Sequence, residues 1–186
     1  MTALLAKEYD KALTLYTQLS EQKEATSFYY LGFLHFKGHG VNQNTKKAFD
    51  YYLEAATREV AVAQFEVALM LENAEGCEQN ESEAAFWYEE AAKRGSMDAY
   101  NNLGAMFKEG RGVPQDYKKA FVLFSKAAEA NNAKAQFNLG ALYDMGLGCE
   151  ENKEKAIEWC RKAAYQGHKM AGGIIKRMQH DGQIVF

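Results

Sequence analysis

The chain has 186 residues, of which 47% are hydrophobic, 25% charged and 13% aromatic. This composition is too apolar and too evenly charged for a disordered chain. One proline against fifteen glycines disfavours a turn-rich all-β fold. The net charge of -3 argues against a general binder of nucleic acid or anionic membranes, which would carry a basic surplus.

Compartment and membrane behaviour are suggested by the chain start and the cysteines. The start, MTALLAKEYD, lacks the pattern of a secretory signal, and no window approaches the ~20 apolar residues of a membrane span. Three sparse cysteines suit reduced thiols better than a disulfide framework. We therefore expect a cytoplasmic protein without membrane insertion, or a periplasmic or secreted one if a signal has been removed.

An internal repeat decides the expected fold. Alanine recurs at a constant step of 36 residues, at positions 12, 48, 84, 120 and 156, and the same step carries Ala-Ala pairs and loop glycines. Such self-similarity is the signature of a repeat architecture. It predicts four units, at residues 25–60, 61–96, 97–132 and 133–168.

The predicted elements follow the same order along the chain. Residues 1–24 hold a capping helix near 8–21, each unit holds a first and a second amphipathic helix, and residues 169–186 hold a capping helix near 169–180 and a tail. A unit of ~36 residues cannot bury its own apolar face, so neighbours must stack. We expect one all-α repeat domain over residues 1–186.

Helix ends recur at fixed phases. First helices are expected to end at the glycines 38, 110 and 146, with Ala74 as the exception. Second helices are expected to begin after the N-caps Asn44, Asn80, Asp116 and Asn152, with Glu83 completing a capping box in the second unit. They are expected to end near Gly95, Asn131 and Gly167, while Glu59 at that phase predicts a turn built differently.

Small residues indicate where helices meet. Gly or Ala stands at 32, 68, 104 and 140, where it lets neighbouring helix axes approach closely. Trp87, Trp159 and the ring series Tyr52, Tyr88 and Phe124 recur at neighbouring phases and are interpreted as shared packing.

The string AYNNLGAMFKEGRGVPQDYKKAFVLFSKAAEANN, residues 99–132, resembles the Sel-1-like repeat, a relative of the tetratricopeptide repeat. The matching elements are A-x-x-N-L-G, G-x-G-V-P-x-D and K-A-x-x-x-x-x-K-A-A, and the resemblance spans nearly the whole chain. It implies a right-handed α-solenoid that serves as an adaptor, a scaffold or a bacterial immunity protein. The cysteine-paired branch of the family has two cysteines in each repeat, a pattern missing here, so its enzymatic associations do not transfer.

The resemblance also implies that first helices line a concave binding face. Asn102 and Asn138 hold the Asn of N-L-G, which in related repeats binds an extended peptide backbone. The alternative is that these amides only join adjacent helices. Asn101 is expected to lie outside the core, and Tyr30 and Glu66 occupy the Asn phase without matching it.

Four aromatics lie on the helix near residues 25–37, at positions 29, 30, 33 and 36, more than one buried stripe requires. Tyr30 and Phe33 are therefore candidates for partner contact, and the alternative is packing under the N-terminal helix. The candidate partner-binding residues are Asn101, Asn102, Asn138, Tyr30, Phe33 and Glu66.

Charge is unevenly distributed along the chain. Residues 66–90 contain eight glutamates and no Lys or Arg, whereas residues 153–186 contain seven Lys or Arg and three acids. The acidic segment suits a basic partner, and the basic end suits an acidic partner or weak head-to-tail packing of copies of a monomer. The alternative is an ordinary solvated surface.

Motifs of catalysis are missing from the sequence. It has no phosphate-binding glycine loop, no H-E-x-x-H and no C-x-x-C, and Gly38 should break the helix between His35 and His39. We expect no catalytic, cofactor or metal site. The leading hypothesis is a non-enzymatic module that binds a protein or peptide, the second is a bacterial immunity protein with a cognate toxin, and the third is an enzyme with a nonstandard site.

Overall fold

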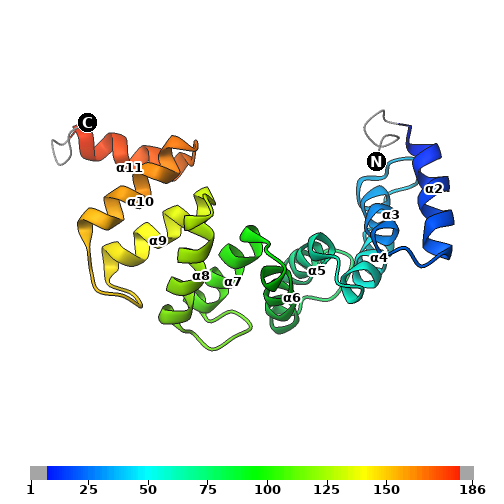
Figure 1. The fold of residues 1–186 in the computed structure, drawn as a ribbon, viewed down its shortest axis with the longest axis horizontal. Helices are drawn as coiled ribbons and strands as arrows, with labels where there is room; N and C mark the ends of the chain where they lie inside the picture. Colours follow the sequence, from blue (N-terminus) through cyan, green and yellow to red (C-terminus); the bar gives the residue numbers. More distant parts are fainter. Residues whose placement is uncertain (1–7, 181–186) are drawn as a thin grey trace. The chain divides into compact units, whose positions relative to one another are not determined.

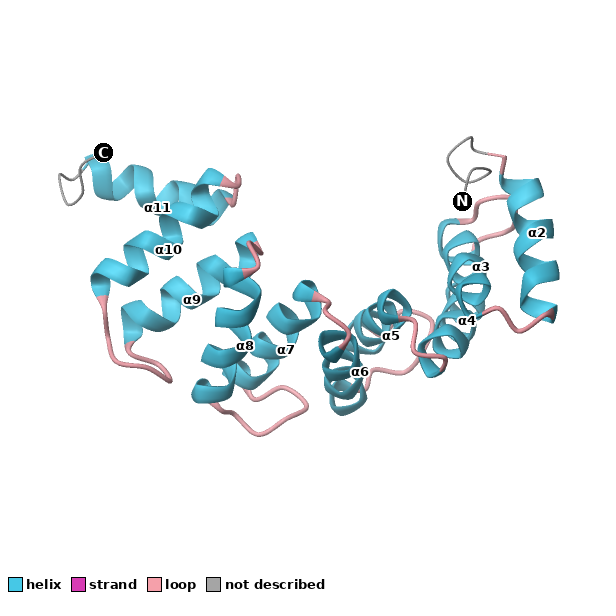
Figure 2. Ribbon diagram, in the orientation of Figure 1, coloured by secondary structure: helices cyan, strands magenta, loops and turns pink. Residues whose placement is uncertain are grey.

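The computed structural model describes residues 8–180, which form ten α-helices and no strand within that range (Figures 1 and 2). The predicted all-α class is confirmed. Residues 1–7 and 181–186 of the two predicted end segments lie outside the described residues. The helices are α2 (Tyr9–Glu21), α3 (Ala25–Lys37), α4 (Thr45–Thr57), α5 (Ala61–Asn73), α6 (Glu81–Lys93), α7 (Met97–Glu109), α8 (Tyr117–Glu129), α9 (Ala133–Met145), α10 (Lys153–Tyr165) and α11 (Lys169–His180).

The chain divides into two compact units, Met1–Ser96 and Met97–Phe186. In unit 1, α3 packs on α4 and α5 on α6, and α2 packs on α3. In unit 2, α7 packs on α8 and α9 on α10, and α11 packs on α10. Within residues 8–180, each unit therefore holds two helix pairs and one end helix, and the border between units falls at the end of the second predicted repeat.

The second helices begin at the predicted N-caps. The side-chain oxygens of Asn44, Asn80, Asp116 and Asn152 accept hydrogen bonds from the amide three residues later, at 2.9, 3.1, 3.0 and 2.8 Å. These bonds satisfy amides that a helix start leaves open. The expected capping box is wrong in detail, because the Glu83 carboxylate accepts from the Asn80 side-chain amide at 3.1 Å while the Asn80 backbone N–H donates to Leu71.

The turn after each second helix has one conformation in all repeats. Glu59 has a φ of 65°, as Asn131 and the equivalent glycines have positive φ, so the prediction that its turn differs is wrong. In each turn the backbone N–H of the following residue donates to a carbonyl oxygen of the preceding helix. An example is Val60 N–H, which donates to Ala55 O at 3.1 Å. The packing of consecutive helices imposes this turn, and Glu59 accepts the left-handed conformation that glycine adopts without strain.

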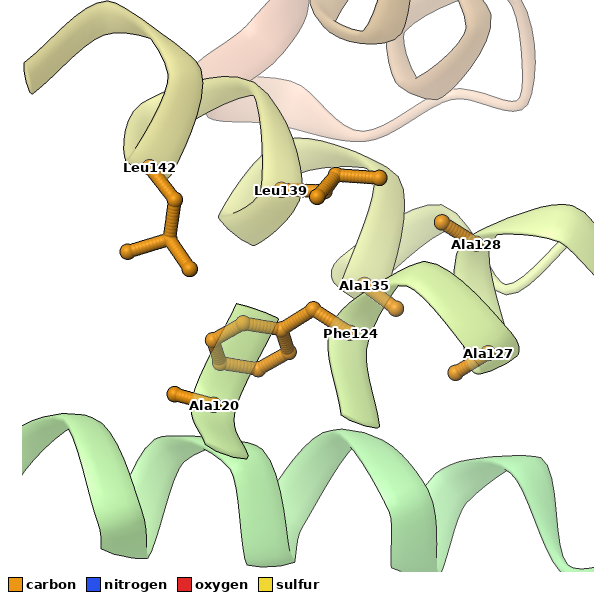
Figure 3. Close-up of a cluster of buried hydrophobic side chains, with 7 residues drawn as sticks. All are labelled: Ala120, Phe124, Ala127, Ala128, Ala135, Leu139 and Leu142. Carbon is orange, nitrogen blue, oxygen red and sulfur yellow. The ribbon is translucent and has the colours of Figure 1, made fainter. Parts of the chain in front are cut away.

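The close helix contacts depend on glycine. A Cβ at Gly32 would lie 2.6 Å from the Tyr52 ring, and a Cβ at Gly104 would lie 2.8 Å from the Phe124 ring. Figure 3 shows the Phe124 ring, which is fully buried, beside Leu139 and Leu142 of α9. One ring therefore fills the space between its own pair and the next first helix.

Replacing Gly104 by Ala tests this contact. The added methyl group meets the Phe124 ring, so we expect a loss of about 1–3 kcal/mol in the free energy of unfolding. The matched control is Gly173→Ala, because a Cβ at Gly173 in α11 meets no atom within 4 Å. That variant should gain up to about 1 kcal/mol from helix propensity. Urea unfolding measures both, and equal effects of the two substitutions would contradict the packing argument.

Candidate partner-binding surface

Each first helix keeps one face partly or fully open to solvent. The residues of this face, here called the first-helix stripe, recur at the 36-residue step. In unit 1 they are Thr26, Tyr30, Phe33 and Lys37 of α3 and Val62, Glu66, Leu69 and Asn73 of α5. In unit 2 they are Asp98, Asn102, Ala105 and Glu109 of α7, Lys134, Asn138, Ala141 and Met145 of α9, and Met170, Ile174 and Arg177 of α11. Five of the six predicted site residues belong to the stripe, and Asn101 does not.

The predicted aromatics of α3 are half-buried, and their rings contact neighbouring side chains. Tyr30 stacks on Tyr16 of α2 with ring centroids 4.6 Å apart. The Phe33 ring lies 5.9 Å from that of His39. The alternative interpretation, packing under the N-terminal helix, therefore holds for Tyr30, while part of each ring remains accessible.

Glu66 is the one acidic residue at the Asn phase of the stripe. It is half-buried in α5, and neither a hydrogen bond nor an ion pair reaches its carboxylate from the described residues. Burial raises the pKa of this carboxyl group, the charge of Lys37 opposes that rise, and the charge of Glu75 adds to it. The same carboxylate contributes to the raised pKa of Tyr29 and of Tyr52, after the larger effect of burial on each ring. Glu66 is therefore a poorly solvated charge that acts electrostatically on both rings.

The raised pKa of Glu66 predicts a pH-dependent effect of the substitution Glu66→Gln. A carboxyl whose pKa is higher in the folded state stabilises the fold below its ordinary value of 4.5 and loses that contribution as the pH rises. Glu66→Gln should therefore unfold at a higher temperature than wild type at pH 7, and the difference should shrink towards pH 4.5. Thermal unfolding followed by circular dichroism measures this, and a destabilised variant at pH 7 would be the opposite result.

The predicted asparagines of unit 2 form a hydrogen-bonded chain. Asn138 of α9 donates from Nδ2 to Asn101 Oδ1 of α7 at 2.9 Å, and Asn101 Nδ2 donates to Asn102 Oδ1 at 3.1 Å. Asn101 is only 5% exposed, so the expectation that it lies outside the core is wrong. Its side chain joins two first helices, which a buried amide achieves because it offers both a donor and an acceptor. The half-buried Asn138 keeps its Oδ1 without a hydrogen bond from the described residues.

Removing the central amide tests its joining role. Asn101→Ala leaves the Asn138 amide without its acceptor, so the free energy of unfolding should fall by about 1–3 kcal/mol. Asn42→Ala, at an exposed loop position, should change it by less than about 0.5 kcal/mol. Urea unfolding of both variants measures the difference, and a neutral Asn101→Ala would show that the chain is not structural.

An apolar groove, which sequence reasoning missed, lies between α9, α10 and α11 in unit 2. Its volume is about 360 Å³. Exposed apolar residues at its edges are Met145, 59% accessible, and Ile174, 40% accessible. Its walls include Gly140, Ala141, Ile157 and Cys160. The groove therefore opens on the first-helix stripe, and Asp144 at its edge forms an exposed ion pair with Lys153 at 3.1 Å.

The groove exists because the fourth repeat lacks a ring. Tyr16, Tyr52, Tyr88 and Phe124 recur at the 36-residue step, and the next position is Cys160. A Cβ at Gly140 would meet Ala156 O at 3.0 Å and no aromatic ring, unlike Gly32 and Gly104. The exception to the ring series was present in the sequence and was the signal that could have revealed the groove.

The described residues offer no group of three His, Cys, Asp or Glu side chains that could hold a metal ion. His35 stacks on Tyr51 at 5.4 Å and His39 on Tyr9 at 4.2 Å, so both imidazoles are used in aromatic packing. Burial raises the pKa of the Cys77, Cys149 and Cys160 thiols, none of which forms a disulfide. Among residues 8–180 no helix is long and apolar enough to cross a membrane.

Repeated helix pairs, shared caps and one recurring glycine contact define an α-helical solenoid repeat protein. The chain belongs to the Sel1-repeat family, whose model matches residues 29–59, 61–96, 98–132 and 133–168. This confirms the resemblance seen in the sequence. Proteins of Sel1 repeats generally mediate protein–protein interactions.

Solved structures support the same assignment. A Sel1 repeat protein from Oxalobacter formigenes is 32% identical, with a TM-score of 0.85 over 91% of this chain and 70% of that one. A protective antigen of uropathogenic Escherichia coli strains, which displays an SLR fold, is also 32% identical, with a TM-score of 0.86 over 91% of this chain and 36% of that one. This chain thus spans about a third of the antigen. No curated protein matches it in sequence.

A more distant likeness is of the fold alone. An immunity protein from Pseudomonas aeruginosa is 20% identical, with a TM-score of 0.56 over 88% of this chain and 60% of that one.

Proposed function

We propose that the chain is a non-enzymatic interaction module whose first-helix stripe binds a protein or peptide partner, with the groove of unit 2 as the main anchoring site. The observation that carries the proposal is the open apolar groove beside Met145 and Ile174. Covering such an apolar surface lowers the free energy by roughly 25 cal/mol for each Å² removed from water. A partner with an apolar side chain at its centre fits this site.

Polar groups around the groove supply orientation. Asn138 precedes Ala141 and Met145 on the same stripe of α9 and offers a free carbonyl oxygen to a backbone N–H. Methionine side chains such as Met145 and Met178 adapt their shape to different apolar partners. The arrangement therefore suits a segment whose backbone follows α9 and whose side chain enters the groove.

The groove is tested with short random peptides displayed on phage and selected on the wild-type protein. For the enriched peptides, Ile174→Glu should weaken binding by about tenfold or more, because a carboxylate in an apolar contact loses its hydration. The matched control is Val122→Glu on α8, because Val122 is 64% exposed and lies outside both the first-helix stripe and the groove. Fluorescence anisotropy measures the affinities. Equal binding by the two variants, or no enriched peptide at all, would contradict the proposal.

Filling the groove gives an independent prediction. Cys160→Phe restores the ring that the other pairs have, with Gly140 on one side and Ile175 on the other. The variant should be more stable by about 1–2 kcal/mol, as cavity-filling substitutions are, and should bind the selected peptides about tenfold more weakly. Urea unfolding and anisotropy measure the two effects. Higher stability with unchanged binding would show that the partner does not bind in the groove.

The acidity of unit 1 favours a second candidate, an immunity protein that neutralises a basic toxin. Residues 66–90 of that unit carry eight glutamates and no Lys or Arg, and of these Glu89 and Glu90 pair with Lys93 and Arg94 just after the segment. Acidic surfaces steer basic proteins to them and speed association. A toxin gene beside the gene for this chain, with toxicity suppressed by co-expression, supports this candidate. Co-expression that leaves the toxicity intact rejects it.

A further inference from the structure

The position of Glu66 is best understood by comparison with unit 2. Two repeats further along, the same position is Asn138, and the residue that Asn138 contacts, Asn101, corresponds to Tyr29. In unit 2 the two amides bond to each other at 2.9 Å. In unit 1 the corresponding pair is the Glu66 carboxylate and the Tyr29 phenol, and no hydrogen bond joins them within the described residues. The repeat therefore places a charge where its own structure supplies no partner.

Nearby cations in unit 1 do not pair with Glu66. Lys37 follows Phe36 on α3, and its Nζ lies over the Phe36 ring at 5.1 Å from the centroid. No ion pair joins Lys37 to Glu66 within the described residues. Arg58 is held by Glu54 at the end of α4, and Arg94 lies 3.0 Å from Glu90 and 2.8 Å from Glu59. The charge of Lys37 offsets part of the Glu66 charge, but no hydrogen bond or ion pair from the described residues reaches the carboxylate.

We propose that Glu66, with the Tyr29 ring at the position equivalent to Asn101, forms a receptor for one basic side chain, arginine or lysine, of a protein partner. This deepens the proposed function, on which it rests, by adding a charged contact in unit 1. A guanidinium or ammonium group can donate to the carboxylate and lie against the face or edge of a tyrosine ring. Partly buried charge pairs of this kind gain more than exposed pairs, because solvent screens them less.

The surroundings of Glu66 fit a long basic side chain. One turn before it on α5 is Val62, 53% exposed, and one turn after it is Leu69, which is half-buried. Both side chains are apolar and partly open to solvent. The methylene groups of lysine or arginine pack on such apolar surface while the charged end reaches the carboxylate. The glutamates of residues 66–90 add a negative potential that attracts the cation.

The competing occupant, a metal ion, is disfavoured by the geometry. Glu66 is a single carboxylate, and no group of three potential ligands exists among residues 8–180. Ca²⁺ takes six to eight oxygen ligands and Mg²⁺ demands near-ideal octahedral geometry, so a single carboxylate suits neither.

The receptor is tested by titrating the full chain with N-acetyl-arginine amide at low salt, followed by NMR of the tyrosine rings. The neutral analogue N-acetyl-citrulline amide has nearly the same shape and serves as the probe control. Wild type should show saturable shifts of the Tyr29 ring with the arginine probe and none with citrulline. Glu66→Gln should reduce the affinity by about tenfold or more, and added salt should weaken binding to wild type.

The matched control variant is Glu78→Gln, which removes one exposed carboxylate from the same acidic segment. It should bind the arginine probe as wild type does. Absence of saturable shifts in wild type, equal binding by Glu66→Gln, or an equal loss in Glu78→Gln would each overturn the proposal. Misfolding does not mimic the expected result, because Glu66→Gln should be more stable than wild type at pH 7.

Failure here is distinct from failure of the proposed function. If library peptides bind the groove of unit 2 while the arginine probe does not bind unit 1, only the receptor is rejected. If no peptide binds, the arginine titration still decides whether Glu66 accepts a cation.

Discussion

The packing of one aromatic ring against one glycine is the contact on which the rest of each unit depends. Tyr52 meets Gly32 and Phe124 meets Gly104, at distances that leave no room for a methyl group. This contact brings the two helices of a pair together, and the same ring reaches the next first helix, as Phe124 reaches Leu139. Where this contact occurs, in the first and third repeats, it fixes which face of the first helix is buried.

The opposite face of the first helices is left open, and its side chains differ from repeat to repeat. In α3 it presents aromatic rings, in α5 a carboxylate between two apolar residues, and in α9 an amide followed by methionine. The ring–glycine contacts of the helix pairs do not involve these side chains. Where the ring itself is missing, at Cys160, the open face deepens into a groove. Repeated packing and variable chemistry thus occupy opposite sides of the same helices.

Most of the fold could be predicted because the helix positions follow from the 36-residue period and from the capping residues. The helix bounds, the N-caps at Asn44 and Asn152 and the glycine ends appear where the repeat places them. The turn at Glu59 was missed, because the packing of consecutive helices overrides the reluctance of Glu to adopt a positive φ.

The candidate site was less predictable, since it depends on which side chains meet across helices. Asn101 looked like a surface residue next to Asn102, but it contacts Asn138 from the neighbouring first helix and is buried. The sequence shows that Glu66 replaces the Asn of the repeat. That its carboxylate lacks a partner follows only from where Tyr29 and Lys37 lie in three dimensions. The groove could be predicted only from the absence of an aromatic residue at Cys160. A comparison of the positions that the repeats share does not detect such an absence.

The central claim is that a partner binds the open face of the first helices where the ring series is interrupted. It is tested most directly by NMR of the chain labelled at methionine and isoleucine methyl groups, during addition of a library-selected peptide. The account predicts that the methyl signals of Met145, Ile174 and Met178, which line the groove, shift most. Unchanged methyl signals of these three residues at a saturating concentration of the peptide would contradict it.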